Sequence, residues 1–174
     1  MYCGNLDFNE EDLKLIDGFS QANFKYNGQI CLQIIGPDAS VYAGRFYNLF
    51  INIPTNYPNE PPTAYFGNSM YHVNVHNDTN QILFYRISKD YWRREMRLFQ
   101  FLIEIFRILV EPDDSKNFFP KNKQNVGIYE LYKHDRPTYH SIARTTIEAQ
   151  PKHSPKNEDP FLDNIDLQYQ FAFE

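Results

Sequence analysis

Three runs of residues in the first 66 positions have patterns that are typical of β-strands. Gln29 to Ile35 is a short, mainly apolar run that ends at Gly36-Pro37. From Gly44 to Ile53, large apolar residues recur at every second position, as in a strand with one buried face. Thr63 to Phe66 is a third run, and the prolines between 54 and 62 exclude a helix before it. Short connections predict an antiparallel meander. The expected buried face of the second run consists of Tyr47, Leu49, Ile51 and Ile53.

The second half of the chain has the patterns of helices. Leu98 to Glu111 is apolar apart from a narrow polar stripe, so we expect most of this helix, including Phe106 and Leu109, to be buried. Two further helices are predicted at 125–133 and 135–149, the second with a proline in its first turn. The polar stripe consists of Gln100, Glu104, Arg107 and Glu111. The expected buried face of the last helix consists of Tyr139, Ile142, Ala143 and Ile147.

The chain is therefore predicted to consist of a core at residues 29–149, an N-terminal segment before it and a C-terminal tail after it. Residues 1–28 form an N-terminal segment with a short helix at 10–17. Residues 150–174 form an extended tail, in which a proline-containing linker precedes a row of alternating apolar residues. That row consists of Ile165, Leu167, Tyr169, Phe171 and Phe173. It could fold back onto its own domain or add to a partner's sheet edge, and we favour the partner because the linker gives the row reach.

Composition narrows the class of protein. The 174 residues suit one globular domain, with 42 % hydrophobic and 17 % aromatic residues. A net charge of −5 disfavours nucleic acid as the main partner. Cys3 and Cys31 cannot build a disulfide framework, and we expect neither a signal peptide nor a transmembrane span. These features predict a reducing intracellular compartment, cytoplasmic by default, with an organellar complex such as a mitochondrial one left open.

Several ordered motifs resemble the core of a ubiquitin-conjugating enzyme. They are GPDASVYAGRF (36–46), IPTNYPNEPP (53–62), YHVNVHNDTNQILFYRISKDYW (71–92), EPDD (111–114) and IYELYKHDRPTYHSIAR (128–144). The resemblance covers roughly residues 29–149. It implies an α/β (α+β) ubiquitin-conjugating-enzyme-like fold, in which a meander sheet packs on a central helix and two C-terminal helices follow.

The resemblance also implies where the family's chemistry would lie. His72-Val73-Asn74 stands at the family's His-Pro-Asn tripeptide, and Leu83 stands where the thiol-bearing cysteine is expected. Leucine has no nucleophilic atom, so we expect no thioester chemistry and no enzyme activity. His72 and Asn74 are then expected to hold the loop together by hydrogen bonds. Cys31 is expected to be a small buried hydrophobe, and an enzyme that uses it is the most remote alternative.

The loops that meet ubiquitin ligases in active members differ as well. Asn59-Glu60 replaces an apolar contact residue, and Arg93-Arg94-Glu95 replaces a Ser-Pro-Ala turn. Arg93, Arg94 and Arg97 are expected to be a solvated basic cluster. A metal site at His72 and His76 is not expected, because this stretch is a loop and no further ligands complete it. No cofactor is predicted.

These features lead to two functional hypotheses. The first is a non-catalytic structural or adaptor subunit that binds other proteins in a stable multi-subunit complex. The alternative is a ubiquitin-binding, non-catalytic cofactor of an active conjugating enzyme, although ubiquitin binding is not favoured. Binding of ubiquitin, or of an active conjugating enzyme, to the purified protein would separate the two.

Overall fold

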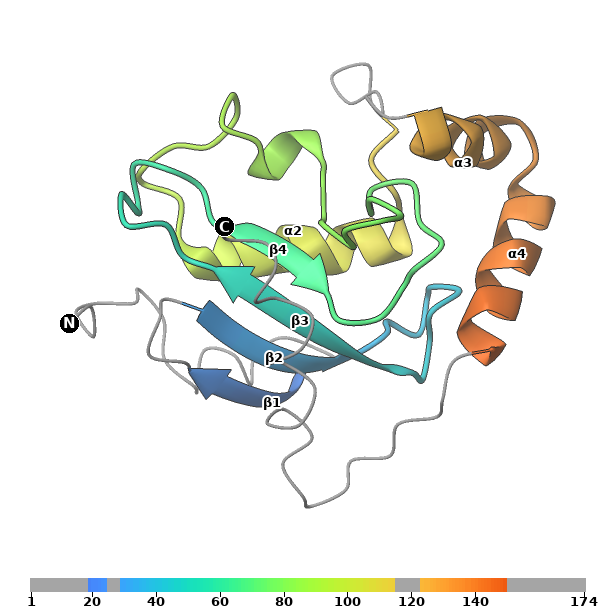
Figure 1. Cartoon of the computed structure of the whole chain (residues 1–174), viewed down its shortest axis with the longest axis horizontal. Helices are drawn as coiled ribbons and strands as arrows, with labels where there is room; N and C mark the ends of the chain where they lie inside the picture. The colour runs from blue at the N-terminus through green and yellow to red at the C-terminus, as the bar shows by residue number, and fades with distance from the viewer. Residues whose placement is uncertain (1–18, 25–28, 115–122, 150–174) are drawn as a thin grey trace.

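A computed structural model describes residues 19–24, 29–114 and 123–149 of the chain, and these form one sheet with helices packed on it (Figure 1). The elements in chain order are β1 (Phe19–Phe24), β2 (Gln29–Ile35), β3 (Phe46–Asn52), β4 (Thr63–Phe66), the 3-10 helix η1 (Tyr85–Ile87), α2 (Leu98–Val110), α3 (Lys123–His134) and α4 (Arg136–Glu148). The short helix expected at 10–17 and the tail row at 165–173 lie outside the described residues.

The sheet is an antiparallel meander in the order β1-β2-β3-β4, which confirms the predicted topology. β2 and β3 pair along their full lengths, from Gln29 with Asn52 to Ile35 with Phe46. β1 was not predicted, because FSQANF has no period-two alternation. It pairs with β2, so the sheet extends into the segment that the sequence had separated from the core. The outer side of β4 is closed by the loop at 80–82, since the Ile82 N–H donates to the Ala64 carbonyl at 2.8 Å.

Helix α2 packs on one face of the sheet and supplies much of the core. Its fully or almost fully buried side chains are Leu98, Phe101, Leu102, Ile105, Ile108 and Leu109. The buried face is narrower than predicted: Ile103 and Val110 are exposed, and Phe106 is only half-buried. The prediction that Phe106 lies in the core therefore holds only in part, because its side chain packs against the edge of the core. The reason is that the sheet covers only one side of the helix, so apolar side chains beyond that side remain accessible.

Helices α3 and α4 lie at one end of the sheet (Figure 1). Their buried side chains contribute to a second apolar cluster. The cluster consists of Val73, Ile128, Tyr132 and Tyr139. Asp135 caps α4, because its carboxylate accepts the Thr138 N–H at 3.2 Å. Tyr139, Ala143 and Ile147 are buried as predicted, whereas Ile142 is 36 % exposed and that part of the prediction was wrong. Ile142 lies on the side of α4 that faces solvent, and no described element packs over it. None of the described helices has the length and hydropathy needed to cross a membrane.

Candidate functional site

The candidate site is built around Leu83, which the fold holds at the surface. Its neighbours Ile82 and Phe84 are buried in the main core, at 2 % and 3 % exposure, while Leu83 is 37 % exposed. Because side chains alternate along an extended segment, anchoring the two neighbours directs Leu83 outward. The Leu83 N–H donates to the Asn74 carbonyl at 2.7 Å. The backbone at position 83 is thus fixed directly beside Asn74.

A tight loop joins Asn74 to Leu83. The His76 N–H donates to the Gln81 carbonyl at 2.9 Å, and the Asn80 N–H donates to the His76 carbonyl at 2.8 Å. Asn80 has a φ of 55°, a left-handed conformation that asparagine adopts more readily than most residues. Val75 and Ile82 form an isolated antiparallel bridge that closes the loop. His76 is therefore used in the loop, and no group of three or more potential metal-ligating side chains occurs among the described residues.

Both ends of the Asn74 side chain are engaged by the segment that follows α2. Its Oδ1 accepts the Asp113 N–H at 2.8 Å, and its Nδ2 donates to the Asp113 carbonyl at 3.1 Å. The Asp113 carboxylate accepts the Tyr85 N–H at 3.2 Å. Asp113 therefore connects the chain on either side of Leu83. Sequence reasoning noted EPDD as a motif but did not assign Asp113 this role, because pairing with its backbone is visible only in three dimensions.

His72 is completely buried and also uses both polar atoms of its ring. Nδ1 accepts the Asn74 N–H at 2.9 Å, so the ring proton is assigned to Nε2, which donates to the Ile108 carbonyl at 2.9 Å. Burial lowers the pKa of His72 from 6.5 to about 4, although the bond to Ile108 opposes this shift. His72 is thus neutral at physiological pH and ties the loop to α2.

Helices α3 and α4 hold the same loop from the other side. Asn125, in the first turns of α3, donates from Nδ2 to the Val73 and Val75 carbonyls at 3.2 and 2.7 Å.

The Tyr42 hydroxyl joins the start of this loop to α4. Tyr42 donates to the Tyr71 carbonyl at 2.7 Å, and its hydroxyl lies 3.3 Å from that of Tyr139. Burial raises the pKa of Tyr139 to about 12, so this hydroxyl stays protonated. Sequence reasoning missed Asn125, because one polar residue near a helix start gives no distinctive pattern.

The one cysteine among the described residues lies in the sheet and not in the loop around Leu83. Cys31 lies on the central strand β2, is 0 % exposed and packs on Phe50, which agrees with the prediction of a buried thiol. The Ser88 hydroxyl is buried and has no hydrogen-bond partner among the described atoms. The tail row that was predicted to bind a partner, from Ile165 to Phe173, lies outside the described residues.

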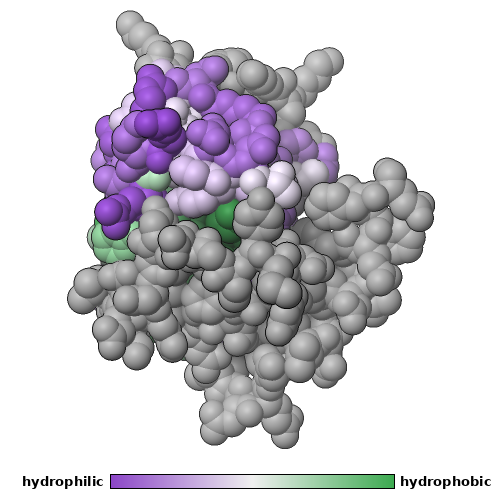
Figure 2. Space-filling model, turned by 90° about the vertical axis from the view of Figure 1, so that its left-hand side faces the viewer, coloured by the Kyte–Doolittle hydropathy of each residue, from purple (hydrophilic) through white to green (hydrophobic). Residues whose placement is uncertain are grey.

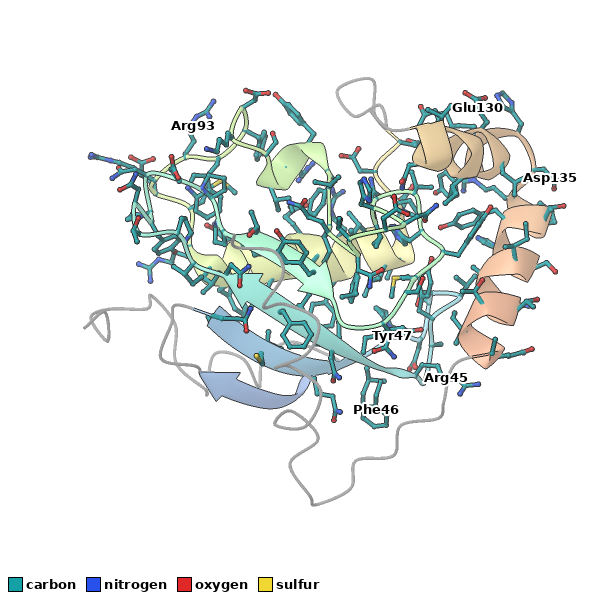
Figure 3. The ribbon with its side chains drawn as sticks, viewed as in Figure 1. Arg45, Phe46, Tyr47, Arg93, Glu130 and Asp135 are labelled. Atoms are coloured by element: carbon teal, nitrogen blue, oxygen red, sulfur yellow. The ribbon has the colours of Figure 1, made fainter. Side chains whose placement is uncertain are left out.

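The loop around Leu83 lies beside the C-terminal end of α2. At the N-terminal end of α2, the loops at 53–62 and 88–97 form a hydrophilic surface (Figure 2). The Trp92 indole donates to the Pro58 carbonyl at 2.7 Å and joins the two loops. Arg93, labelled in Figure 3, donates to the Asp90, Tyr91 and Trp92 carbonyls at 2.9–3.3 Å. Arg94 pairs with Glu95 at 3.1 Å. Two of the three arginines of the expected basic cluster are therefore neutralised or used inside their own loop.

The fold and these motifs agree with comparisons to known proteins. Residues 14–147 match the family model described as ubiquitin-conjugating enzyme. The match begins before β1, as expected if that strand is part of the fold. The chain is also similar to Ubiquitin-conjugating enzyme E2 14 of Schizosaccharomyces pombe, with 32 % identity over 114 residues, which are 66 % of this chain and 69 % of the relative. The match covers the sheet, the loop around Leu83 and the helices, and the chain belongs to the ubiquitin-conjugating enzyme family.

Proposed function

We propose that this chain is a non-catalytic member of its family that works as a structural or adaptor subunit of a larger protein assembly. The observation that carries the proposal is the position of Leu83. Its backbone is bonded to Asn74, its neighbours are anchored in the core, and its side chain faces the surface. A thioester with ubiquitin would need a thiolate at such a surface position, and a leucine side chain offers only carbon atoms.

The groups around Leu83 also support a structural role. A general base must be free to take a proton from the attacking group. His72 has both ring nitrogens occupied and is 0 % exposed, so it cannot reach such a group without breaking the loop. An oxyanion donor must point at the reacting carbonyl. The Asn74 Nδ2 uses one of its two N–H groups to donate to the Asp113 carbonyl, which makes Asn74 a brace between two segments.

The hydrophilic loop surface favours an adaptor over an active conjugating enzyme. In active members these loops are expected to bind ligases through apolar contacts. Here Asn59, Arg93, Arg94 and Glu95 are exposed, and Lys89 pairs with Glu60 at 3.6 Å. Exposed ion pairs of this kind contribute little to binding energy. We place the protein in a reducing intracellular compartment, since the two cysteines of the sequence cannot build a disulfide framework.

A second candidate function is a ubiquitin-binding cofactor that assists an active conjugating enzyme. The described fold from β1 to α4 favours it, because a family member that retains the sheet, the central helix and the two C-terminal helices can retain a surface for ubiquitin without the nucleophile. Titration of isotope-labelled ubiquitin with the purified protein separates the two. Saturable shifts in the ubiquitin spectrum would support the cofactor, whereas an unchanged spectrum would support the adaptor.

Catalytic silence is tested by incubating the protein with activating enzyme, ATP and ubiquitin. We expect no adduct that a reducing agent removes, and the same result for the Cys31→Ser and Cys3→Ser variants. Leu83→Cys is the matched variant, because it restores a surface thiol without changing the anchors Ile82 and Phe84. An adduct on Leu83→Cys alone would support the proposal that Leu83 occupies the nucleophile position. An adduct on the unaltered protein that disappears in Cys31→Ser would overturn the proposal.

The adaptor role itself is tested by identifying the proteins that co-purify with this chain. A tagged full-length chain should co-purify with a fixed set of subunits at constant stoichiometry, and the same set should be recovered with Leu83→Cys. Recovery of ubiquitin and an active conjugating enzyme as the main partners would instead favour the cofactor.

A further inference from the structure

The sheet has two faces, and only one of them is covered by a helix in the described part of the chain. Leu32, Leu49 and Phe66 belong to the face that packs on α2. In Figure 1 β3 and β4 pass in front of α2, β2 and β1 follow below them, and α3 and α4 lie at one end of the sheet. Figure 3 shows Phe46 extending from β3 away from the helices. The face opposite α2, called the outer face below, carries Gln29, Cys31, Gln33, Ile35, Phe46, Asn48, Phe50, Asn52, Thr63 and Tyr65.

Three side chains at the centre of the outer face are nevertheless buried. Cys31 is 0 %, Gln33 is 4 % and Phe50 is 5 % exposed. Gly67 approaches the Phe50 ring so closely that a Cβ there would lie 2.8 Å from it, so one edge of the ring is covered locally. Neighbouring side chains in the same sheet can cover the sides of these side chains but not their outer ends. Because a glutamine side chain stands roughly perpendicular to the sheet, the burial of Gln33 requires atoms above the outer face.

The chemistry of the outer face limits what can cover it. β2, β3 and β4 contain no charged residue, so the face offers apolar side chains and neutral amides. Gln29 already donates to Asn52 at 2.8 Å, which satisfies part of the polar rim. A suitable cover is an uncharged apolar row of about the length of a strand, since a charge placed there would be desolvated without a counter-ion.

We propose that the outer face is the docking site of the chain's own C-terminal residues 161–174, which replaces the preference for a partner's sheet edge that we drew from the tail pattern and its linker. This segment carries large apolar residues at every second position from Ile165 to Phe173, and its three acids do not belong to that row. Extended over nine residues, the row is about 30 Å long, enough to cross the sheet. Its apolar side chains lie against Cys31, Phe50 and Phe46, and its polar side chains face solvent.

The connection permits this arrangement and makes it favourable. Ile147, in the last turn of α4, is buried in the same cluster as the sheet, so the tail starts beside the core. Residues 150–160 can span about 36 Å when extended, which reaches any part of the outer face. A segment tethered to its site has an effective concentration in the millimolar range and outcompetes most free partners.

Cys31 provides a probe of this face in the full-length protein. In a Cys3→Ser background, its reaction with N-ethylmaleimide under native conditions is followed by mass spectrometry. We expect slow labelling of the parent chain. The paired change Tyr169→Asp and Phe171→Asp should accelerate labelling about tenfold or more, because it places charges in the apolar row and uncovers the thiol. The matched control is Gln168→Asp and Gln170→Asp, which adds the same charges to the other side of the segment and should leave the rate unchanged.

A synthetic peptide of residues 161–174 distinguishes local uncovering from loss of folding. Added to the full-length chain that carries Tyr169→Asp and Phe171→Asp, it should restore slow labelling of Cys31, whereas the peptide with both Asp substitutions should not. Equal labelling rates in the paired variant and its control would overturn the proposal and assign the cover to residues 1–18 or a separate partner. Loss of protection on dilution of the parent chain would also overturn it, since a second copy would then supply the tail. No ubiquitin takes part, so the outcome is independent of the proposed function.

Discussion

At the scale of single residues, His72 shows how this fold uses a polar side chain inside its core. The imidazole lies between the loop at 71–76 and the end of α2, and it satisfies one backbone donor and one backbone acceptor. A protonated ring would have two donors and could no longer accept the Asn74 N–H. Burial adds a penalty for the charge, which is why the pKa falls to about 4. His72 therefore stabilises the loop only while it is neutral.

This arrangement predicts a specific loss of stability in mild acid. The folded pKa of His72 is lower than the unfolded value of 6.5, so the unfolded chain takes up the proton first as the pH falls. The contribution is complete above pH 6.5, declines below it and is fully lost below the folded value of about 4. Between pH 7 and pH 5 we expect His72 to account for a loss of about 2 kcal/mol in unfolding free energy.

The measurement is urea unfolding of the parent chain and of His72→Gln at both pH values. Gln can donate to the Ile108 carbonyl but has no proton to gain, so its stability, although lower, should change less between the two pH values. An equal change in the two proteins would show that other groups cause the acid sensitivity.

At the scale of elements, α2 shows that an almost entirely apolar helix need not be buried all round. Leu102 is 0 % exposed, while its neighbour Ile103 is 43 % exposed. The exposed side is organised by Glu104, which accepts from Arg107 at 2.9 Å and from Arg86 of η1 at 3.0 Å. The Gln100 side chain accepts the Arg97 N–H at 2.8 Å and so supports the start of the helix. The helix thus meets the sheet through one apolar face and is fixed by polar contacts on the other.

Adjacent substitutions in α2 should therefore differ strongly in cost. Leu102→Ala removes a fully buried side chain and should lower the unfolding free energy by about 2 to 5 kcal/mol through the cavity it leaves. Ile103→Ala is the matched control and should cost less than about 1 kcal/mol, because the side chain is exposed and alanine favours helix. Half-buried Phe106→Ala should fall between them. Denaturant midpoints at constant slope measure all three, and similar values for Leu102→Ala and Ile103→Ala would contradict the assigned faces.

At the scale of the whole molecule, aromatic contacts connect the main core to α3 and α4. Tyr71 packs on both apolar clusters, and its ring lies 5.6 Å from that of Tyr139. Tyr132 contacts the Tyr139 ring edge to face at 5.1 Å, and Arg136 lies over the Tyr132 ring at 4.5 Å. Asn125 adds its two hydrogen bonds to the loop beside Leu83. The two C-terminal helices should consequently unfold together with the sheet.

A local probe near Trp92 and a probe of the total secondary structure can together test this cooperativity. Trp92 is the single tryptophan and packs on Phe101 and Tyr57, far along the chain from α4. Its fluorescence and the far-ultraviolet circular dichroism should give the same urea midpoint. Tyr139→Ala should lower both midpoints equally, at a cost of about 3 to 5 kcal/mol. A dichroism change that precedes the fluorescence change would show that α3 and α4 form a separate folding unit.

The sequence by itself determined the meander, the central helix and the last two helices, because each depends on local patterns. Period-two alternation marked β3, Gly36-Pro37 marked the C-terminal end of β2, and Pro137 lay in the first turn of the helix predicted from Asp135. The family motifs placed His72, Asn74 and Leu83 in one loop, and the structure brings Asn74 and Leu83 into direct contact.

Tertiary structure alone decided which apolar residues are buried and which polar groups brace the site. Phe106 and Ile142 fit the apolar pattern of their helices, yet burial depends on what packs opposite them, and no local pattern encodes that. β1 has no alternation of its own and exists through its pairing with β2. The Asp113 N–H donates to the Asn74 side chain 39 residues away in the chain, and the Asn125 side chain donates to carbonyls 50 and 52 residues away. Contacts over such separations arise only once the sheet and helices have assembled, which is why the sequence could place Leu83 in a motif but could not show what holds it there.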